Sequence, residues 1–158
     1  MINQPPIINI FEKAVRKASK AMIRDFGEIE NLQINSKSVG DFVTNADINA
    51  EKSLLETLQS YFPDVTYLSE EKGLIKGNDE MIVIDPIDGT TNFIHGIPII
   101  GIVVAKIKDN EITDGVIFNP ISNDFFWASK GNGAWCNNKR LRVSKRENLE
   151  TCIIGTGI

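Results

Sequence analysis

Residues 81–93 have the sequence MIVIDPIDGTTNF, which joins an apolar run to a group of acidic and turn-forming residues. Met81 to Ile84 is a continuous apolar run that is too short for a helix, so it predicts a buried strand. We expect the strand to end abruptly at Asp85-Pro86, because proline fixes φ and has no backbone N–H. The segment therefore predicts a rigid strand that delivers polar side chains to one end of a sheet.

Asp85 and Asp88 lie on either side of a predicted tight turn, which can point both carboxylates into one space. Two such groups repel each other unless a cation lies between them, and Mg²⁺ prefers carboxylate oxygens. The Ile87 carbonyl inside the turn is a candidate for a further oxygen ligand. The alternative is a solvated surface turn, because Asp and Gly are common in turns and short motifs give many false matches.

Gly89, Thr90 and Thr91 follow the two aspartates and carry backbone N–H groups and hydroxyls. If a short helix starts there, these donors form a site for a phosphate group. A hard metal beside a phosphate site suits the attack of water on a phosphate monoester, since a bound metal lowers the pKa of its water ligand. The hydroxyl pair also weakens the surface-turn alternative, because a solvated turn has no need of it.

Two more acidic positions are candidates for the same site. Glu70 follows a short predicted strand, Val65 to Leu68, so its carboxylate can converge with those at the end of the Met81 strand. Taken alone, Glu70-Glu71 is a surface charge pair. Asp47 also has a structural alternative, because Thr44 and Asp47 form a T-x-x-D capping box that opens a helix.

The rest of the chain predicts an α+β architecture. Apolar residues at helical spacing predict a first helix over Ile10 to Phe26 that stops at Gly27, a loop or short hairpin over 31–40, and a second helix from Thr44 to Pro63. Ile48 belongs to the predicted apolar stripe of the second helix. Lys72 to Glu80 is expected to be a polar loop.

Strands separated by turn signals follow from residue 97 onward, and they predict an antiparallel meander. Two N-terminal helices packed on a large antiparallel sheet are therefore expected. Thr151 to Ile158 is expected to start another strand. The predicted strands lie at Ile97–Ala105 continuing to Ile107, Ile112–Phe118, Asp124–Ala128 and Leu141–Val143, with turns at Asp109-Asn110, Asn119-Pro120, Gly131–Gly133 and Asn137-Asn138.

Composition favours one ordinary cytoplasmic domain. The chain has 158 residues, 42% hydrophobic and 24% charged, with a formal charge of −4, which argues against a general nucleic-acid-binding face. Its longest apolar stretch is far shorter than the ~20 residues of a membrane span, and no signal peptide is evident. The two cysteines lack disulfide or zinc spacing and are expected to be buried thiols.

Other catalytic systems are excluded because their sequence motifs are absent. The chain has one histidine, His95, and no G-x-S-x-G elbow for a Ser-His-Asp hydrolase. No G-x-x-x-x-G-K-[ST] loop is present. An aspartyl-phosphate enzyme usually places its two carboxylates closer in sequence than Asp85 and Asp88. His95 is expected to be a packing or loop residue.

The motifs 41–47 (DFVTNAD), 69–71 (SEE), 85–93 (DPIDGTTNF) and 126–137 (FWASKGNGAWCN) resemble, in order and spacing, the inositol monophosphatase family, and bacterial members in particular. The resemblance covers nearly the whole chain. It implies the N-terminal part of a layered α-β-α-β-α sugar-phosphatase fold. Members of the family continue further, so residues 1–158 are expected to be one N-terminal α+β domain without the C-terminal half, which supplies another metal-binding Asp. The activity of such a fragment on its own is in doubt.

The resemblance also implies roles for the candidate residues. Glu70, Asp85 and the Ile87 carbonyl would hold a first Mg²⁺, and Asp85 with Asp88 a second. Glu70 and Thr90 would orient and activate the attacking water, and Asp47 would support Thr90. The phosphate would be bound by Ile87, Asp88, Gly89 and Thr90, with Glu70 also facing the substrate.

The expected reaction is hydrolysis of a small phosphorylated polyol or sugar, inositol 1-phosphate first. The alternatives are fructose 1,6-bisphosphate, histidinol phosphate or a nucleotide phosphate as substrate. A non-catalytic regulatory or binding module, associated with RNA polymerase as for some bacterial relatives, also stays open. Lithium sensitivity and a homodimer are further implications, whereas no membrane contact and no direct nucleic-acid binding are expected.

Overall fold

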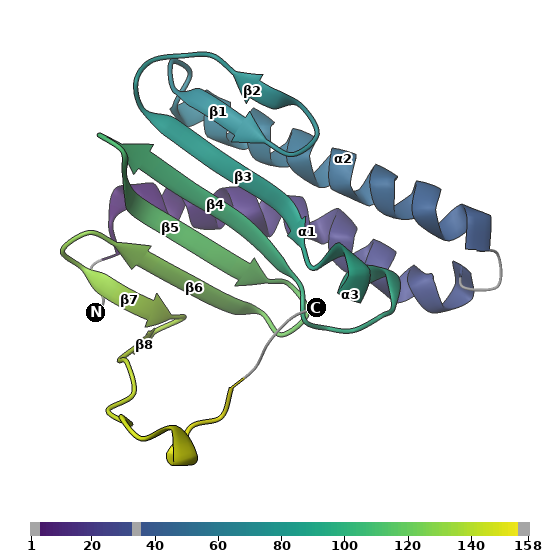
Figure 1. Ribbon diagram of the computed structural model, residues 1–158. Coiled ribbons are helices and arrows are strands. Elements are labelled where there is room, and N and C mark those ends of the chain that lie inside the picture. The colour runs from purple at the N-terminus through teal and green to yellow at the C-terminus, as the bar shows by residue number, and fades with distance from the viewer. Residues whose placement is uncertain (1–3, 33–35, 155–158) are drawn as a thin grey trace.

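The computed structural model describes residues 4–32 and 36–154, with the backbone alone over 29–32 and 36–44. Two long helices, α1 (Pro6–Leu32) and α2 (Ser36–Tyr61), pack against one face of an eight-stranded sheet (Figure 1). Helix α1 contacts β4, β5 and β6, whereas α2 contacts β3 and the short helix α3 (Thr90–Ile94). The predicted α+β fold, with two N-terminal helices on a large sheet, is confirmed.

The sheet has the strand order β2-β1-β3-β4-β5-β6-β7-β8. From β3 to β8 every neighbouring pair is antiparallel, which is the predicted meander, but β1 pairs with β3 in parallel, so the sheet is mixed. The turn between β4 and β5 has left-handed backbone at Asp109 (φ 52°) and Asn110 (φ 61°), as the hairpin signal predicts. The strands are β1 (Thr66–Ser69), β2 (Gly73–Ile75), β3 (Met81–Asp88), β4 (Gly101–Lys108), β5 (Glu111–Asn119), β6 (Asp124–Ser129), β7 (Gly133–Cys136) and β8 (Lys139–Arg140).

The core lies between the two helices and the sheet. Side chains spaced three and four apart on the helices meet every second side chain of the central strands, which is the packing that the two periodicities allow. This core fixes the ends of β1 and β3 relative to α2. Its members include Phe11, Ala14, Val15, Ala18 and Met22 from α1, Leu54, Leu55 and Leu58 from α2, and Tyr67, Ile82, Ile84, Ile102, Val104, Val116 and Phe118 from the sheet.

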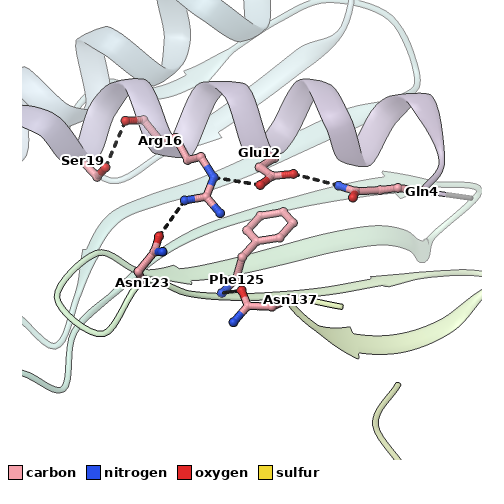
Figure 2. Close-up of polar contacts among 7 residues, drawn as sticks. All are labelled: Gln4, Glu12, Arg16, Ser19, Asn123, Phe125 and Asn137. Carbon is pink, nitrogen blue, oxygen red and sulfur yellow. Dashed lines mark hydrogen bonds and ion pairs between the residues drawn. The ribbon is translucent and has the colours of Figure 1, made fainter. Parts of the chain in front are cut away.

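Arg16 attaches α1 to the turn between β5 and β6. Its guanidinium bonds Glu12 Oε1 and Asn123 Oδ1, each at 2.8 Å (Figure 2). The same group lies over two aromatic rings, 4.7 Å from the centroid of Phe118 and 5.7 Å from that of Phe125. Charge, hydrogen bonds and ring stacking thus act on one side chain, which is a role that arginine fills better than lysine.

The helix boundaries differ from those predicted. Helix α1 continues through Gly27 to Leu32, and α2 already begins at Ser36, so the predicted loop over 31–40 is helical over 31–32 and 36–40. Gly27 costs only about 1 kcal/mol within a helix. Thr44 and Asp47 therefore lie inside α2, and the predicted capping box is wrong. Ile48 is exposed rather than part of the apolar face.

Several strand boundaries also differ. The predicted polar loop 72–80 contains β2, and β3 continues through Pro86 to Asp88. Residues 97–99 lie before β4 and are exposed. The last hairpin uses β8 rather than residues 141–143.

The end of the described chain does not form the predicted strand. A short 3₁₀ helix (Leu149–Thr151) precedes residues 152–154, which have no regular structure, and residues 155–158 lie outside the described part. Both cysteines are free, but Cys136 is half-buried and Cys152 exposed, so the expectation of buried thiols is wrong. Within residues 4–32 and 36–154, no helix combines the length and apolar character that crossing a membrane requires.

Candidate functional site

The parallel pairing of β1 and β3 brings two of the predicted acidic residues to one end of the sheet. Ser69 at the end of β1 pairs with Ile84 of β3, so Glu70 and Asp85 each follow directly after this pair. The two strands run in the same direction there, so the residues that follow the pair emerge side by side. The expectation that two strand ends converge is thus met by the register of the sheet.

The segment after Ile84 leaves the regular ladder. Asp85 pairs with Val103 and Asp88 with Gly101, and the register shifts between them, so the chain bulges where the sequence predicts a tight turn. Ile87 is buried and anchors the bulge in the core. The hydroxyl of Thr90 donates to the Ile87 carbonyl at 3.0 Å. A carbonyl has two lone pairs, so this bond leaves one for a further partner.

Gly89 is the residue that allows the chain to enter α3. Its backbone is left-handed (φ 88°), and a Cβ there would lie 3.0 Å from the Ile99 carbonyl. Both facts favour glycine over any other residue. Asn92 of α3 donates through Nδ2 to the same carbonyl at 2.7 Å and holds the loop that returns to β4. A short helix, α3, does start after Gly89, which is the condition that the phosphate site requires, whereas phosphate binding there stays a prediction.

Asp47 lies on the buried side of α2 and faces other carboxylates. Burial, followed by the charges of Glu70, Glu71, Asp85 and Glu51, raises the pKa of Asp47 to about 7. These carboxylates are therefore close enough to Asp47 to disfavour its ionisation.

Asp85 responds to its surroundings in the same direction. Burial raises the pKa of Asp85, the charges of Asp88 and Glu70 raise it further, and a hydrogen bond from the Ile87 backbone partly offsets them. Asp47, Glu70, Asp85 and Asp88 are thus linked electrostatically, although they come from three separate elements. The structure brings all four predicted acidic residues into one region.

Three buried oxygens in this region have no hydrogen-bond partner among the described residues: Asp47 Oδ1, Ser69 Oγ and Asp85 Oδ1. A buried polar atom without a partner costs free energy, so such atoms require an explanation. Carboxylate and hydroxyl oxygens are the donors that hard divalent cations prefer. The donor chemistry therefore fits Mg²⁺. In the described part of the chain, however, no three His, Cys, Asp or Glu side chains are grouped as a ready metal site.

Some predicted relationships differ in detail. The prediction pairs Thr90 with Asp47. The Thr90 hydroxyl donates its hydrogen bond to the Ile87 carbonyl, in the bulge of β3. His95 ends α3 and is exposed, as expected for a loop residue. The roles assigned to Glu70, Asp47 and the phosphate-binding residues stay predictions.

Glu51 is a buried acid near the site that the sequence reasoning missed. Its side chain is only 1% exposed, and Oε2 accepts a hydrogen bond from the Glu71 backbone N–H at 2.8 Å. Glu51 follows Asp47 by one helical turn, which places both on the same face of α2. In the sequence, that spacing shows only that Glu51 shares a helix face with Asp47.

Comparison with known proteins gives consistent matches. A model described as the inositol monophosphatase family matches residues 3–158. An inositol-1-monophosphatase of Caulobacter vibrioides is 46% identical over 150 residues, which are 92% of this chain and 59% of the relative. A protein named Nus factor SuhB from Xylella fastidiosa is 38% identical over 98% of this chain and 56% of the relative.

Solved structures agree with the sequence matches. The crystal structure of the extragenic suppressor protein suhB from Bartonella henselae superposes with a TM-score of 0.83 at 38% identity. The match covers 94% of this chain and 58% of that one. The chain thus spans less than two thirds of the length of these relatives.

Proposed function

This chain belongs to the inositol monophosphatase family, and we propose that it carries the metal-binding part of a phosphate-monoester hydrolase site. The observation that carries the proposal is the set of buried, unpartnered oxygens of Asp47, Ser69 and Asp85, which come from α2, β1 and β3. Burial, followed by the charges of neighbouring carboxylates, raises the pKa values of Asp47 and Asp85, so a cation in this region would offset part of the repulsion. A divalent metal held by Asp85 would give the buried Asp85 oxygen a partner and offset the charges of the neighbouring carboxylates.

In the proposed site Glu70, Asp85 and the Ile87 carbonyl hold one Mg²⁺, and Asp85 with Asp88 holds a second. Glu70 and Asp88 are exposed, which leaves their side chains free to turn inward on binding. This rearrangement reconciles the proposal with the lack of a ready three-ligand group among the described residues. When bound, the metal lowers the pKa of a water ligand and offsets charge on the phosphate.

The remaining residues orient the reactants. Glu70 and the Thr90 hydroxyl hold the attacking water, and the bond from Thr90 to the Ile87 carbonyl fixes the hydroxyl beside the bulge. Asp88, Gly89 and Thr90 lie against the phosphate, where the start of α3 presents backbone N–H groups. Asp47 is buried near Glu70 and Asp85, and its proposed role is to support Thr90.

Inositol 1-phosphate is the proposed substrate, and a relative named inositol-1-monophosphatase with 46% identity supports this choice. Fructose 1,6-bisphosphate, histidinol phosphate and nucleotide phosphates stay as alternatives. A homodimer, a cytoplasmic location and inhibition by Li⁺ belong to the same proposal. All are proposals for the whole protein, because the chain spans 56–59% of these relatives.

A second candidate function is regulatory binding, with RNA polymerase as the partner. The observation that favours it is the name Nus factor SuhB, which several relatives with 35–38% identity carry. Capture of purified RNA polymerase by the protein tests it directly. Capture without phosphatase activity would favour this second function.

The test of the first function is release of inorganic phosphate from inositol 1-phosphate with Mg²⁺, with Mg²⁺ and Li⁺, and with EDTA. We expect turnover that needs Mg²⁺, falls with Li⁺ and drops by at least ~100-fold in Asp85→Asn, because a metal ligand is lost. Glu56→Gln, an exposed position on α2, is the matched control and keeps full activity. A protein that neither binds Mg²⁺ in calorimetry nor releases phosphate from any substrate named above would overturn the proposal.

A further inference from the structure

Glu51 is a buried acid that the proposed reaction does not use directly. It lies on α2 among the apolar residues Ala50, Leu54 and Leu55, all of which are buried. An acidic side chain is rarely so buried unless it is hydrogen-bonded or paired, because loss of water is costly. A hydrogen-bond partner for the buried Glu51 carboxylate is therefore expected.

That partner is the turn between β1 and β2. The closing pair of this hairpin is Ser69 with Gly73, so Glu70, Glu71 and Lys72 form the turn. The Glu71 backbone N–H donates to Glu51 Oε2 at 2.8 Å, a contact that joins positions 20 residues apart.

Resting on the proposed function, we propose that Glu51 is a positioning residue that holds the β1–β2 turn so that Glu70 faces the metal. Glu70 is bonded directly to Glu71, so fixing the Glu71 N–H fixes where the Glu70 side chain starts. Helix α2 is in turn held by the core, and Glu51 transmits this rigidity to an exposed ligand. Partners behind a metal ligand commonly set its orientation in this way.

The hydrogen bond from the Glu71 N–H to Glu51 leads to a prediction that separates the effect of this bond from the effect of the Glu51 charge. The amide oxygen in Glu51→Gln still accepts the Glu71 N–H, whereas Glu51→Ala has no acceptor and Glu51→Asp withdraws it by one methylene. Calorimetric titration of the full chain with Mg²⁺ alone should give Kd values about 10-fold or more above wild type for the Ala and Asp variants. The Gln variant should stay within about 3-fold, since its hydrogen bond is kept.

Thr57→Ala is the matched control for simple loss of stability. Thr57 is also buried and polar on α2, and its hydroxyl donates to the Ser53 carbonyl at 2.9 Å, away from the β1–β2 turn. Its variant should lower the melting temperature and leave the Mg²⁺ Kd unchanged. If Glu51→Ala does not fold, the Asp variant decides.

Asp85→Asn, measured in the same titration, separates the two proposals. Loss of binding in Asp85→Asn with wild-type affinity in both Glu51→Ala and Glu51→Asp would overturn the positioning role and leave the metal site intact. Wild-type affinity in Asp85→Asn would instead overturn the proposed function itself. Weaker binding in Glu51→Gln equal to that in Glu51→Ala would also overturn the positioning role, because the charge alone would then matter.

Discussion

Asp47 shows at the scale of one residue how the fold changes side-chain chemistry. Its pKa rises from 3.8 to about 7, first through burial and then through the charges of Glu70, Glu71, Asp85 and Glu51. The folded chain therefore keeps a proton that the unfolded chain releases across this pH range. The contribution of Asp47 to the free energy of unfolding of the metal-free protein therefore falls as the pH rises from about 4 to about 7.

Asp47→Asn removes this titration. We expect the variant to be more stable than wild type by roughly 1–2 kcal/mol at pH 8 in EDTA, less than the full shift implies because water and neighbouring groups relax. At pH 4 wild type and Asp47→Asn should have nearly the same free energy of unfolding. Urea denaturation at both pH values measures the difference, with Glu56→Gln as the exposed control. A wild-type pH slope in Asp47→Asn would contradict the assignment.

Gly89 and Gly27 form a natural pair for a second residue-scale prediction. Gly89→Ala must adopt a positive φ and bring its Cβ to 3.0 Å from the Ile99 carbonyl, whereas a Cβ at Gly27 meets nothing within 4 Å. We expect Gly89→Ala to lose about 1–3 kcal/mol and Gly27→Ala, within α1, to gain up to about 1 kcal/mol. Thermal unfolding of both variants checks the opposite signs, and equal changes would exclude this explanation.

At the scale of elements, the hairpin turns after β4 could be predicted from the sequence, whereas the β1–β2 hairpin and the helix ends could not. Turns such as Asp109-Asn110 are specified locally, because few residues adopt left-handed backbone. Helix α1 continues through Gly27 and α2 begins before the apparent capping box at Thr44, so neither local signal marks a true boundary.

The same division holds for the candidate site. Asp85 and Glu70 could be predicted as candidates because each follows a short run predicted to be a strand. The parallel pairing of β1 with β3, which places them side by side, was not predicted. Glu51 could not be predicted, because a glutamate next to Lys52 on a helix is typical of a solvated face. Only the position of the β1–β2 turn over α2 shows that Glu51 is buried and hydrogen-bonded.

Arg16 gives the prediction at this scale, since it joins one helix to one turn. Arg16→Ala removes the hydrogen bond to Asn123 and the stacking on Phe118, so we expect a loss of about 1–3 kcal/mol. Arg16→Lys should recover only part of it, because lysine lacks the planar group. Lys20→Ala, exposed on the same helix, should change stability by less than about 0.5 kcal/mol. Chemical denaturation ranks the three variants, and equal losses would contradict the arrangement in Figure 2.

At the scale of the whole molecule, the hydrophobic core holds several acidic side chains close to one another. Helix α2, the β1–β2 turn and the bulge of β3 each bring acidic side chains to one region, and the core between the helices and the sheet fixes the three elements relative to one another. Without a cation, the repulsion and the unpartnered oxygens lower the stability of the fold. A cation that binds only the folded state should therefore stabilise the entire chain.

This linkage can be measured as a shift in melting temperature. At a Mg²⁺ concentration ten times Kd the folded state should gain about 1.4 kcal/mol, which corresponds to roughly 3–6 °C for a domain of this size. At one fixed Mg²⁺ concentration the gain should be larger at pH 8 than at pH 5, because protons compete with the cation for Asp85, whose pKa is raised, and a proton on Asp47 removes a negative charge beside the site. Asp85→Asn should abolish the gain, and NaCl at equal ionic strength should not reproduce it. The same melting temperature in Mg²⁺ and in EDTA at pH 8 would show that the acidic region binds no divalent ion and that its repulsion is balanced by other means.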